Sequence, residues 1–181
     1  MSELRILGGS AKGRRLKIPE SARPTGARVK KSMFDILGIF ASGSSFLDLY
    51  AGAGGVGLEA ASRGFEVVMV ELNPRAAETL ERNRRALALS GRVLKADAKK
   101  FIGSIRDSFD IVFIDPPYAH DILEVCKLAL GQLELVNDDG VLIVQHPVQL
   151  ELIAASHYVL ERRQYGSNVL TFYWKQTQEE S

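Results

Sequence analysis

The chain has 181 residues, a net charge of +1 and a hydrophobic fraction of 46%, which is ample for a core. Its length suits one compact α/β domain with a small appendage, and no apolar run reaches the ~18 residues that a membrane-spanning helix needs. The single cysteine, Cys126, excludes an intrachain disulfide and lies in a helical pattern, where it predicts a small buried side chain. We expect a soluble, cytoplasmic protein that binds no membrane.

The positive charge is concentrated in residues 1–40, which carry nine Lys or Arg against three acidic residues. The remaining 14 basic and 19 acidic residues lie in residues 41–181. Such a basic appendage indicates a polyanionic partner, nucleic acid first, although an ordinary solvated surface is the alternative. We predict three parts: an RNA-binding extension over 1–40, a catalytic domain over 41–175 and a disordered tail over 176–181.

Glycines and a proline among these cations predict a short β-hairpin, followed by a turn at residues 23–25. A helix should follow over residues 26–40, with Thr25 as its N-cap and one apolar stripe. The stripe consists of Val29, Met33, Phe34 and Leu37.

From residue 45 onward, strand and helix patterns alternate, which predicts a mostly parallel sheet covered on both faces. After Pro147 we expect a short helical piece and then an antiparallel hairpin over 158–163 and 169–174. Other strands are expected near 45–50, 66–71, 92–97, 109–115 and 139–145, and helices near 56–63, 74–89, 98–105 and 119–131.

A glycine-rich turn follows the first of these strands. Gly52, Gly54 and Gly57 fit the G-x-G-x-x-G spacing, and Glu71 ends the next apolar run. Glycines let the backbone approach a ligand closely, and an acid so placed accepts hydrogen bonds from ribose hydroxyls. Both features suit the ribose of NAD as well as that of S-adenosylmethionine, so a nicotinamide oxidoreductase is a competing interpretation.

Two further acids favour S-adenosylmethionine. Asp48, at the mouth of the first strand, would repel a pyrophosphate but can bind the ammonium of a methionine moiety, directly or through water. Asp97 ends a later strand pattern and could accept from an adenine amino group, with a solvated strand end as the alternative. Because ligands of such sheets bind beyond the carboxyl ends of the strands, we expect four acids on one rim. They are Asp48, Glu71, Asp97 and Asp115.

The tetrapeptide Asp115-Pro116-Pro117-Tyr118 follows a buried-strand pattern and is similar to the catalytic loop of enzymes that methylate an exocyclic amine. The lone pair of an aromatic amine is delocalised into its ring, so a site must present acceptors that hold the N–H groups. The Asp115 carboxylate and the Pro116 carbonyl are such acceptors, neither proline brings a competing N–H, and Tyr118 offers a face for a stacked base. The alternative is a chain break with Asp115 as the cap of the next helix.

Taken together, the motifs resemble the bacterial S-adenosylmethionine-dependent enzymes that methylate guanine N2 in small-subunit (16S) ribosomal RNA. The resemblance runs from about Arg5 to Trp174. It implies a Rossmann-like class I methyltransferase with a seven-stranded, mostly parallel sheet, a C-terminal antiparallel hairpin and a small N-terminal hairpin and helix. The residues that carry it are 5–9, 13–16, 23–25, 28–29, 47–52, 115–118 and 165–166.

The resemblance also implies roles for single residues. The catalytic loop would be Asp115, Pro116, Pro117 and Tyr118. S-adenosylmethionine would be bound by Asp48, Tyr50, Gly52, Gly54, Gly57, Glu71, Leu72, Asn73, Asp97 and Ala98. RNA would be bound by Arg5, Lys12, Arg14, Arg15, Arg23, Thr25, Arg28 and Lys31. The implied partner is 16S rRNA in the small ribosomal subunit or its assembly intermediate, and we expect a monomer without a metal.

Several other polar residues are interpreted more plainly. The family often has Arg where this chain has Lys30, and Asn where it has Asp35; a Lys would lose bidentate phosphate binding. We interpret His120 as a solvated helix start, rather than a proton acceptor, and His146 and His157 as strand-end and surface positions. These scattered residues lack metal-ligand spacing. A second cationic cluster is interpreted as a solvated helix face and comprises Arg82, Arg84 and Arg85.

The predicted reaction is in-line methyl transfer to the amine of a guanine swung out of its stack, with Asp115 as an aligner rather than a strong base. Three alternatives stay open. An adenine-N6 methylase shares the tetrapeptide but would normally need a larger recognition region. A nicotinamide oxidoreductase leaves the tetrapeptide unexplained, and a non-catalytic RNA-binding module would tolerate loss of Asp115 and of the glycines.

Overall fold

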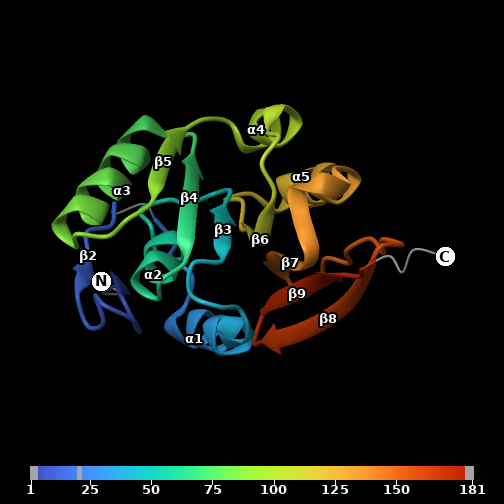
Figure 1. The fold of residues 1–181 in the computed structure, drawn as a ribbon, viewed down its shortest axis with the longest axis horizontal. Helices are drawn as coiled ribbons and strands as arrows, with labels where there is room; N and C mark the ends of the chain where they lie inside the picture. Colours follow the sequence, from blue (N-terminus) through green and yellow to red (C-terminus); the bar gives the residue numbers. More distant parts are fainter. Residues whose placement is uncertain (1–3, 20–21, 178–181) are drawn as a thin grey trace. The chain divides into compact units, whose positions relative to one another are not determined.

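The computed structural model describes residues 4–19 and 22–177, in a chain that divides into two compact units, Met1–Asp97 and Ala98–Ser181 (Figure 1). The fold is α/β, with a seven-stranded, mostly parallel sheet to which the first unit contributes three strands and the second unit four. The predicted fold class is therefore confirmed. No described helix is long and apolar enough to cross a membrane.

The first unit opens with an antiparallel hairpin, β1 (Leu4–Arg5) and β2 (Arg15–Leu16), as predicted. Helix α1 (Ala27–Ile36) and a 3-10 turn, η1 (Leu37–Ile39), follow and bury the predicted apolar stripe. The predicted N-cap was wrong, because Gly26 occupies that position and makes no side-chain cap bond. Gly26 O is the first carbonyl that accepts a helical hydrogen bond, which Lys30 N–H donates at 3.0 Å. Thr25 therefore lies outside the helix.

Three parallel strands form the sheet of this unit, in the order β5 (Arg92–Lys95), β4 (Glu66–Glu71), β3 (Ser45–Asp48). Parallel neighbours need crossover connections, and helices α2 (Gly57–Ser62) and α3 (Pro74–Ala86) supply them. Figure 1 shows α3 alongside β5, with the N-terminal hairpin near the C-terminal end of α3. The apolar residues of β3 and most of those of β4 are buried, as continuous hydrophobic runs predict for a sheet covered on both faces, whereas those of the edge strand β5 are half-buried.

The second unit begins with α4 (Ala98–Ser104), β6 (Phe109–Ile114) and α5 (Ala119–Gly131). A 3-10 turn, η2 (Leu133–Leu135), leads to β7 (Val136–Pro147), which is parallel to β6. The last strands, β8 (Tyr158–Tyr165) and β9 (Asn168–Lys175), form a hairpin whose β9 is antiparallel to β7. The predicted antiparallel end of the sheet is confirmed.

One expectation for this unit was wrong. Residues 148–157 form turns and irregular structure instead of a helical piece. Neighbouring elements hold that backbone, since Val148 N–H donates to Ser167 O at 2.9 Å and Tyr173 Oη donates to Ile153 O at 2.7 Å. His146 lies at the end of β7, as predicted, and it is buried because this strand is flanked by β6 and β9.

The predicted boundaries after residues 40 and 175 stay predictions. Residues 178–181 of the predicted tail lie outside the described residues.

Candidate functional site

Three acidic residues stand at the carboxyl ends of the parallel strands in the first unit. Asp48 ends β3, Glu71 ends β4, and Asp97 follows β5 by two residues. In the strand register, Glu71 is aligned with Lys95, the last residue of β5. These acids therefore share one rim of the unit, as expected from the sequence. Asp115 belongs to the second unit, and its place on this rim stays a prediction.

The glycine loop, residues 50–57, joins β3 to α2. Gly54 has a φ of +100°, and a Cβ added there would come within 2.5 Å of Leu58 Cδ1. A Cβ on Gly57 would come within 2.5 Å of Met69 Cγ. Both positions need glycine because the loop passes so close to the sheet and to its own helix.

Two rim acids hold this loop in place. Asp48 is almost fully buried, and its Oδ2 accepts from Gly57 N–H at 2.9 Å. Glu71 accepts from Gly52 N–H at 2.7 Å and from Asn73 N–H at 2.8 Å, one bond on each carboxylate oxygen. A carboxylate has about four lone-pair sites, so the half-exposed Glu71 keeps capacity for ribose hydroxyls. The loop thus fits the predicted nucleoside cofactor, while an ammonium contact of Asp48 stays a prediction.

The other predicted cofactor residues are spread around this rim. Tyr50 is half-buried at the start of the loop, whereas Leu72, directly after Glu71, is 60% exposed. Asn73 is the N-cap of α3 and accepts from Arg75 N–H and Ala76 N–H. The structure therefore joins the loop, Glu71 and Asn73 through direct hydrogen bonds. The last two predicted cofactor residues are adjacent in the sequence, where the chain divides into its two units. Asp97 is half-buried and belongs to the first unit, and Ala98 is buried at the start of α4.

In the second unit, the loop of residues 115–118 joins β6 directly to α5. Pro116 is buried, whereas Tyr118 is 63% exposed. Tyr118, whose side chain makes no cap bond, is the N-cap of α5, so the alternative of Asp115 at the cap position was wrong. The Tyr118 and His120 rings are stacked, with centroids 5.7 Å apart and planes 18° apart. His120 is exposed, as expected, but its stacking on Tyr118 was not foreseen; the signal was two aromatic rings spaced i, i+2 at a helix start.

The cations predicted to bind RNA all have exposed side chains, and Thr25 is half-buried. Lys31 pairs with Asp35 at 2.7 Å on the outer face of α1. Arg14 Nη2 donates to Ala86 O, at the C-terminal end of α3, at 3.1 Å. This arrangement is suitable for contacting a polyanion, and the contact itself stays a prediction.

Lys30 does not belong to that exposed set, although the sequence interpretation treated it as a phosphate contact. It is 1% exposed, and its Nζ lies 3.2 Å from Glu59 Oε2 and donates to Arg5 O at 2.8 Å. Burial lowers the pKa of Lys30, and the Glu59 carboxylate opposes that shift. The sequence interpretation was wrong because Lys30 lies on the buried face of α1, together with Met33 and Phe34.

Three buried polar residues that the sequence interpretation missed attach the N-terminal extension to helices α2 and α3. Glu59, on α2, accepts from Leu7 N–H at 2.8 Å as well as from Lys30. Ser62 Oγ donates to Gly8 O at 2.6 Å. A polar residue within an apolar helix stripe is the only sequence signal for them, and it does not identify their partners.

The third of these residues, Asn83 on α3, has the most distant partners. Its Oδ1 accepts from Lys17 N–H at 3.0 Å, and its Nδ2 donates to Lys17 O at 2.8 Å and to Ala53 O at 2.9 Å. One buried side chain thus holds both the segment after β2 and the glycine loop.

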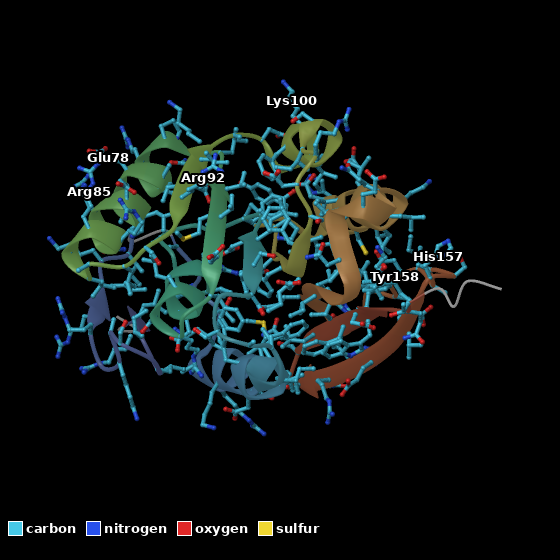
Figure 2. All side chains as sticks on the ribbon, in the orientation of Figure 1. Glu78, Arg85, Arg92, Lys100, His157 and Tyr158 are labelled. Atoms are coloured by element: carbon cyan, nitrogen blue, oxygen red, sulfur yellow. The ribbon has the colours of Figure 1, made fainter. Side chains whose placement is uncertain are left out.

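The second cationic cluster is largely the solvated helix face that the sequence predicts. Figure 2 shows Glu78 and Arg85 on the outer side of α3, and Arg82 pairs with Glu78 at 3.1 Å. Arg84 differs, because it is partly buried and binds the Glu81 carboxylate, whose pKa it lowers to about 2.

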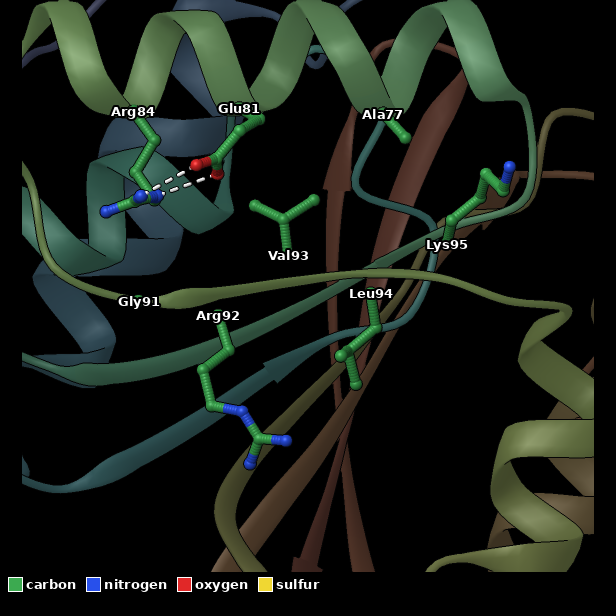
Figure 3. Close-up of a pocket in the computed structure, with 8 residues that line it drawn as sticks. All are labelled: Ala77, Glu81, Arg84, Gly91, Arg92, Val93, Leu94 and Lys95. Atoms are coloured by element: carbon green, nitrogen blue, oxygen red, sulfur yellow. Dashed lines mark hydrogen bonds and ion pairs between the residues drawn. The ribbon is translucent and has the colours of Figure 1, made fainter.

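Arg84 and Glu81 line a hollow of about 350 Å³ between α3 and β5 (Figure 3). In Figure 3 the two side chains are bonded to each other, Val93 faces α3 and Arg92 points away from it. The charges of Arg84 and Glu81 are therefore satisfied by each other within the hollow. It offers no catalytic constellation.

Other reactive side chains are accounted for by packing. Cys126 is buried, as predicted, and burial raises the pKa of its thiol to about 11. Its Sγ lies 3.8 Å from Tyr173 Oη. Within residues 4–19 and 22–177, no group of three His, Cys, Asp or Glu side chains is placed to hold a metal ion.

Comparison with known proteins yields a consistent set of relatives. The model of the family described as "Conserved hypothetical protein 95" matches residues 4–174. The chain is 33% identical to "Putative rRNA methyltransferase YlbH" of Bacillus subtilis, over 95% of this chain and 99% of that protein. It is 30% identical to "Ribosomal RNA small subunit methyltransferase D" of Escherichia coli K12, over 99% and 93% of the two chains. The solved "Putative methyltransferase yhhF" of Escherichia coli is 27% identical, with a TM-score of 0.87 over 98% of this chain and 100% of that chain.

Proposed function

Because the chain belongs to the Conserved hypothetical protein 95 family and is at least 30% identical to two rRNA methyltransferases, we propose that it methylates the N2 amine of a guanine in 16S rRNA. The coarser activity, rRNA methylation, follows from the family. The choice of an exocyclic amine is supported by one observation above all, the loop Asp115-Pro116-Pro117-Tyr118 at the carboxyl end of β6.

The first unit supplies the cofactor site. S-adenosylmethionine, when bound, provides an electrophilic methyl group on its sulfonium. Glu71 accepts from the ribose hydroxyls with the lone pairs that Gly52 and Asn73 leave available, and the glycine loop lets the cofactor approach the backbone. Asp48 supports the loop from beneath, and Asp97 accepts from the adenine amino group.

The second unit holds the amine. The Asp115 carboxylate and the Pro116 carbonyl accept the two N–H groups of the guanine, which orients the nitrogen lone pair toward the methyl group. The attacking nitrogen becomes acidic only after it has taken up the methyl group, and it then releases a proton to Asp115 or to water. Tyr118, stacked on His120, offers an exposed aromatic face to a base that has left its stack.

The N-terminal extension positions the RNA. Its exposed Arg and Lys side chains contact phosphates, which fix register and orientation without reading sequence. The 30% identity to a small-subunit rRNA methyltransferase supports 16S rRNA, in the small subunit or its assembly intermediate, as the partner.

The decisive experiment uses S-adenosylmethionine labelled in its methyl group, with unmodified small ribosomal subunits, free 16S rRNA or duplex DNA as acceptor. The products are digested to nucleosides and identified. Label in N2-methylguanosine from subunits or rRNA is the expected result, and Asp115→Ala should remove it. Label in a methyladenine, or transfer only to DNA, would overturn the substrate assignment while keeping the cofactor.

A further inference from the structure

A second hollow, which we call the α3 groove, borders α3 on the side of the N-terminal extension. Its volume is about 230 Å³. The lining residues come from the segment after β2 and from one face of α3, and they are Lys17, Ile18, Pro19, Arg75, Thr79 and Arg82. Arg75, Thr79 and Arg82 are spaced i, i+4 and i+7, so they share one helix face, and the two arginines start about 10 Å apart along the axis.

The segment opposite α3 is held in place through its backbone. Lys17 N–H and Lys17 O both bond to the Asn83 side chain, at 3.0 and 2.8 Å. Arg14 is attached to Ala86 at the end of the same helix. The extension therefore follows α3 from Ala86 back toward Arg75. Two cationic clusters that are far apart in the sequence thus form one continuous surface.

The cations of the α3 groove are available to a ligand. Among residues 4–19 and 22–177, neither the Lys17 ammonium nor the Arg75 guanidinium has an ion-pair or hydrogen-bond partner. Within the described part of the chain, Arg82 pairs only with Glu78, and both of these side chains are about two-thirds exposed, at 66% and 68%. An exposed pair of this kind is weak and screened by solvent, so a phosphate can replace Glu78. The hollow on the other side of α3 differs, since Glu81 satisfies Arg84 there.

We propose that the α3 groove binds the phosphate backbone of the RNA substrate, as a second anchoring position continuous with the basic extension. The inference rests on the proposed function for the identity of the polyanion. Guanidinium groups on separate helical turns can contact different phosphates, and Lys17 adds a point charge from the opposite wall. Because the extension is bonded to the helix, the two walls are already assembled before RNA binds, which reduces the entropy lost on binding.

The test is the salt dependence of binding to deproteinised 16S rRNA for Lys17→Gln/Arg75→Gln. Each phosphate contact contributes roughly 0.7–0.9 to the slope of log affinity against log salt, so the slope should fall by about 1.5. The KM for RNA should rise about tenfold in low salt, whereas kcat at saturating RNA and the affinity for S-adenosylmethionine should not change.

The matched control, Arg106→Gln/Lys127→Gln, removes the same charge from exposed positions of the second unit, outside the α3 groove. It should keep the wild-type slope, and Lys17→Arg/Arg75→Lys should keep it as well, because these changes retain the charge. If the groove variant and the control behave alike, the proposal is overturned. It is also overturned if the two differ on whole subunits but not on free rRNA, since the groove would then contact protein.

This test is separate from that of the proposed function. Should the product prove not to be N2-methylguanosine, the guanine assignment would fail, yet a selective loss of slope in the groove variant would still support RNA binding at α3.

Discussion

The glycine loop of the first unit and the Asp115 loop of the second both follow a buried parallel strand, but they are held in different ways. The glycine loop is fixed by side chains from other elements, among them Glu71 and Asn83. The Asp115 loop is short and fixed by its own two prolines, one of them buried. A loop that must cradle a large ligand needs distant supports, whereas a loop that presents two acceptors can be rigid by itself.

The largest expected effect tests the Asp115 loop. Asp115→Ala should lower kcat by about 10²–10³-fold, because the amine loses a preorganised acceptor. The affinity for S-adenosylmethionine, measured by calorimetry, and the melting temperature should stay close to wild type, since the supports of the glycine loop are untouched. Asp107→Ala, in the exposed segment before β6, is the control and should keep full activity. Equal losses of turnover and cofactor affinity would contradict this separation.

The supports of the first unit should behave in the opposite way. Glu59→Gln leaves the buried Lys30 ammonium without its counter-charge, which should reduce the free energy of unfolding by about 3 kcal/mol in urea titration. The double variant Lys30→Met/Glu59→Leu removes both buried charges and should recover part of the lost free energy of unfolding. Recovery should be incomplete, because Leu7 N–H still lacks its acceptor. If Glu59→Gln lowers the free energy of unfolding by less than about 1 kcal/mol, the Lys30–Glu59 ion pair does not stabilise the unit.

A smaller effect should follow from Asn83→Ala, which removes three hydrogen bonds that hold Lys17 and Ala53. We expect a loss of about 2 kcal/mol, given a cost of about 1–3 kcal/mol when buried backbone groups lose a partner. Affinities for RNA and for S-adenosylmethionine should fall together, because one side chain holds both segments. Asn73→Ala on the same helix removes only an N-cap, and its expected cost is about 1 kcal/mol. Equal costs for the two variants would argue against a bridging role of Asn83.

The smallest effect concerns pH and the second unit. Burial lowers the pKa of His146, whose Nε2 lies 2.8 Å from Thr171 Oγ1. The unfolded chain therefore takes up a proton near pH 6.5 that the folded chain resists. The free energy of unfolding should fall as the pH is lowered from 7 toward 5. His146→Gln should flatten that fall, and identical pH dependence in both proteins would contradict the assignment.

Local patterns in the sequence were enough to predict most of the fold and the candidate site. The glycine spacing, the acids at the strand ends and the Asp115 tetrapeptide depend on neighbouring residues and on hydrophobic periodicity. The errors lie where remote contacts decide. Lys30 looked like a phosphate contact, yet it is buried. The residues after Pro147, where a short helical piece was expected, form hydrogen bonds to the hairpin through their backbone instead.

The sequence by itself therefore determined the order and type of the elements, the basic character of the extension and the residue types of both loops, because each arises from local periodicity or composition. Only the tertiary structure decided which polar groups support the glycine loop and that the extension lies along α3. Those facts depend on hydrogen bonds between residues far apart in the chain, such as Leu7 with Glu59, 52 residues apart, and Lys17 with Asn83, 66 apart. Burying a charge or an amide is tolerable only where such a partner exists, and no local pattern names that partner.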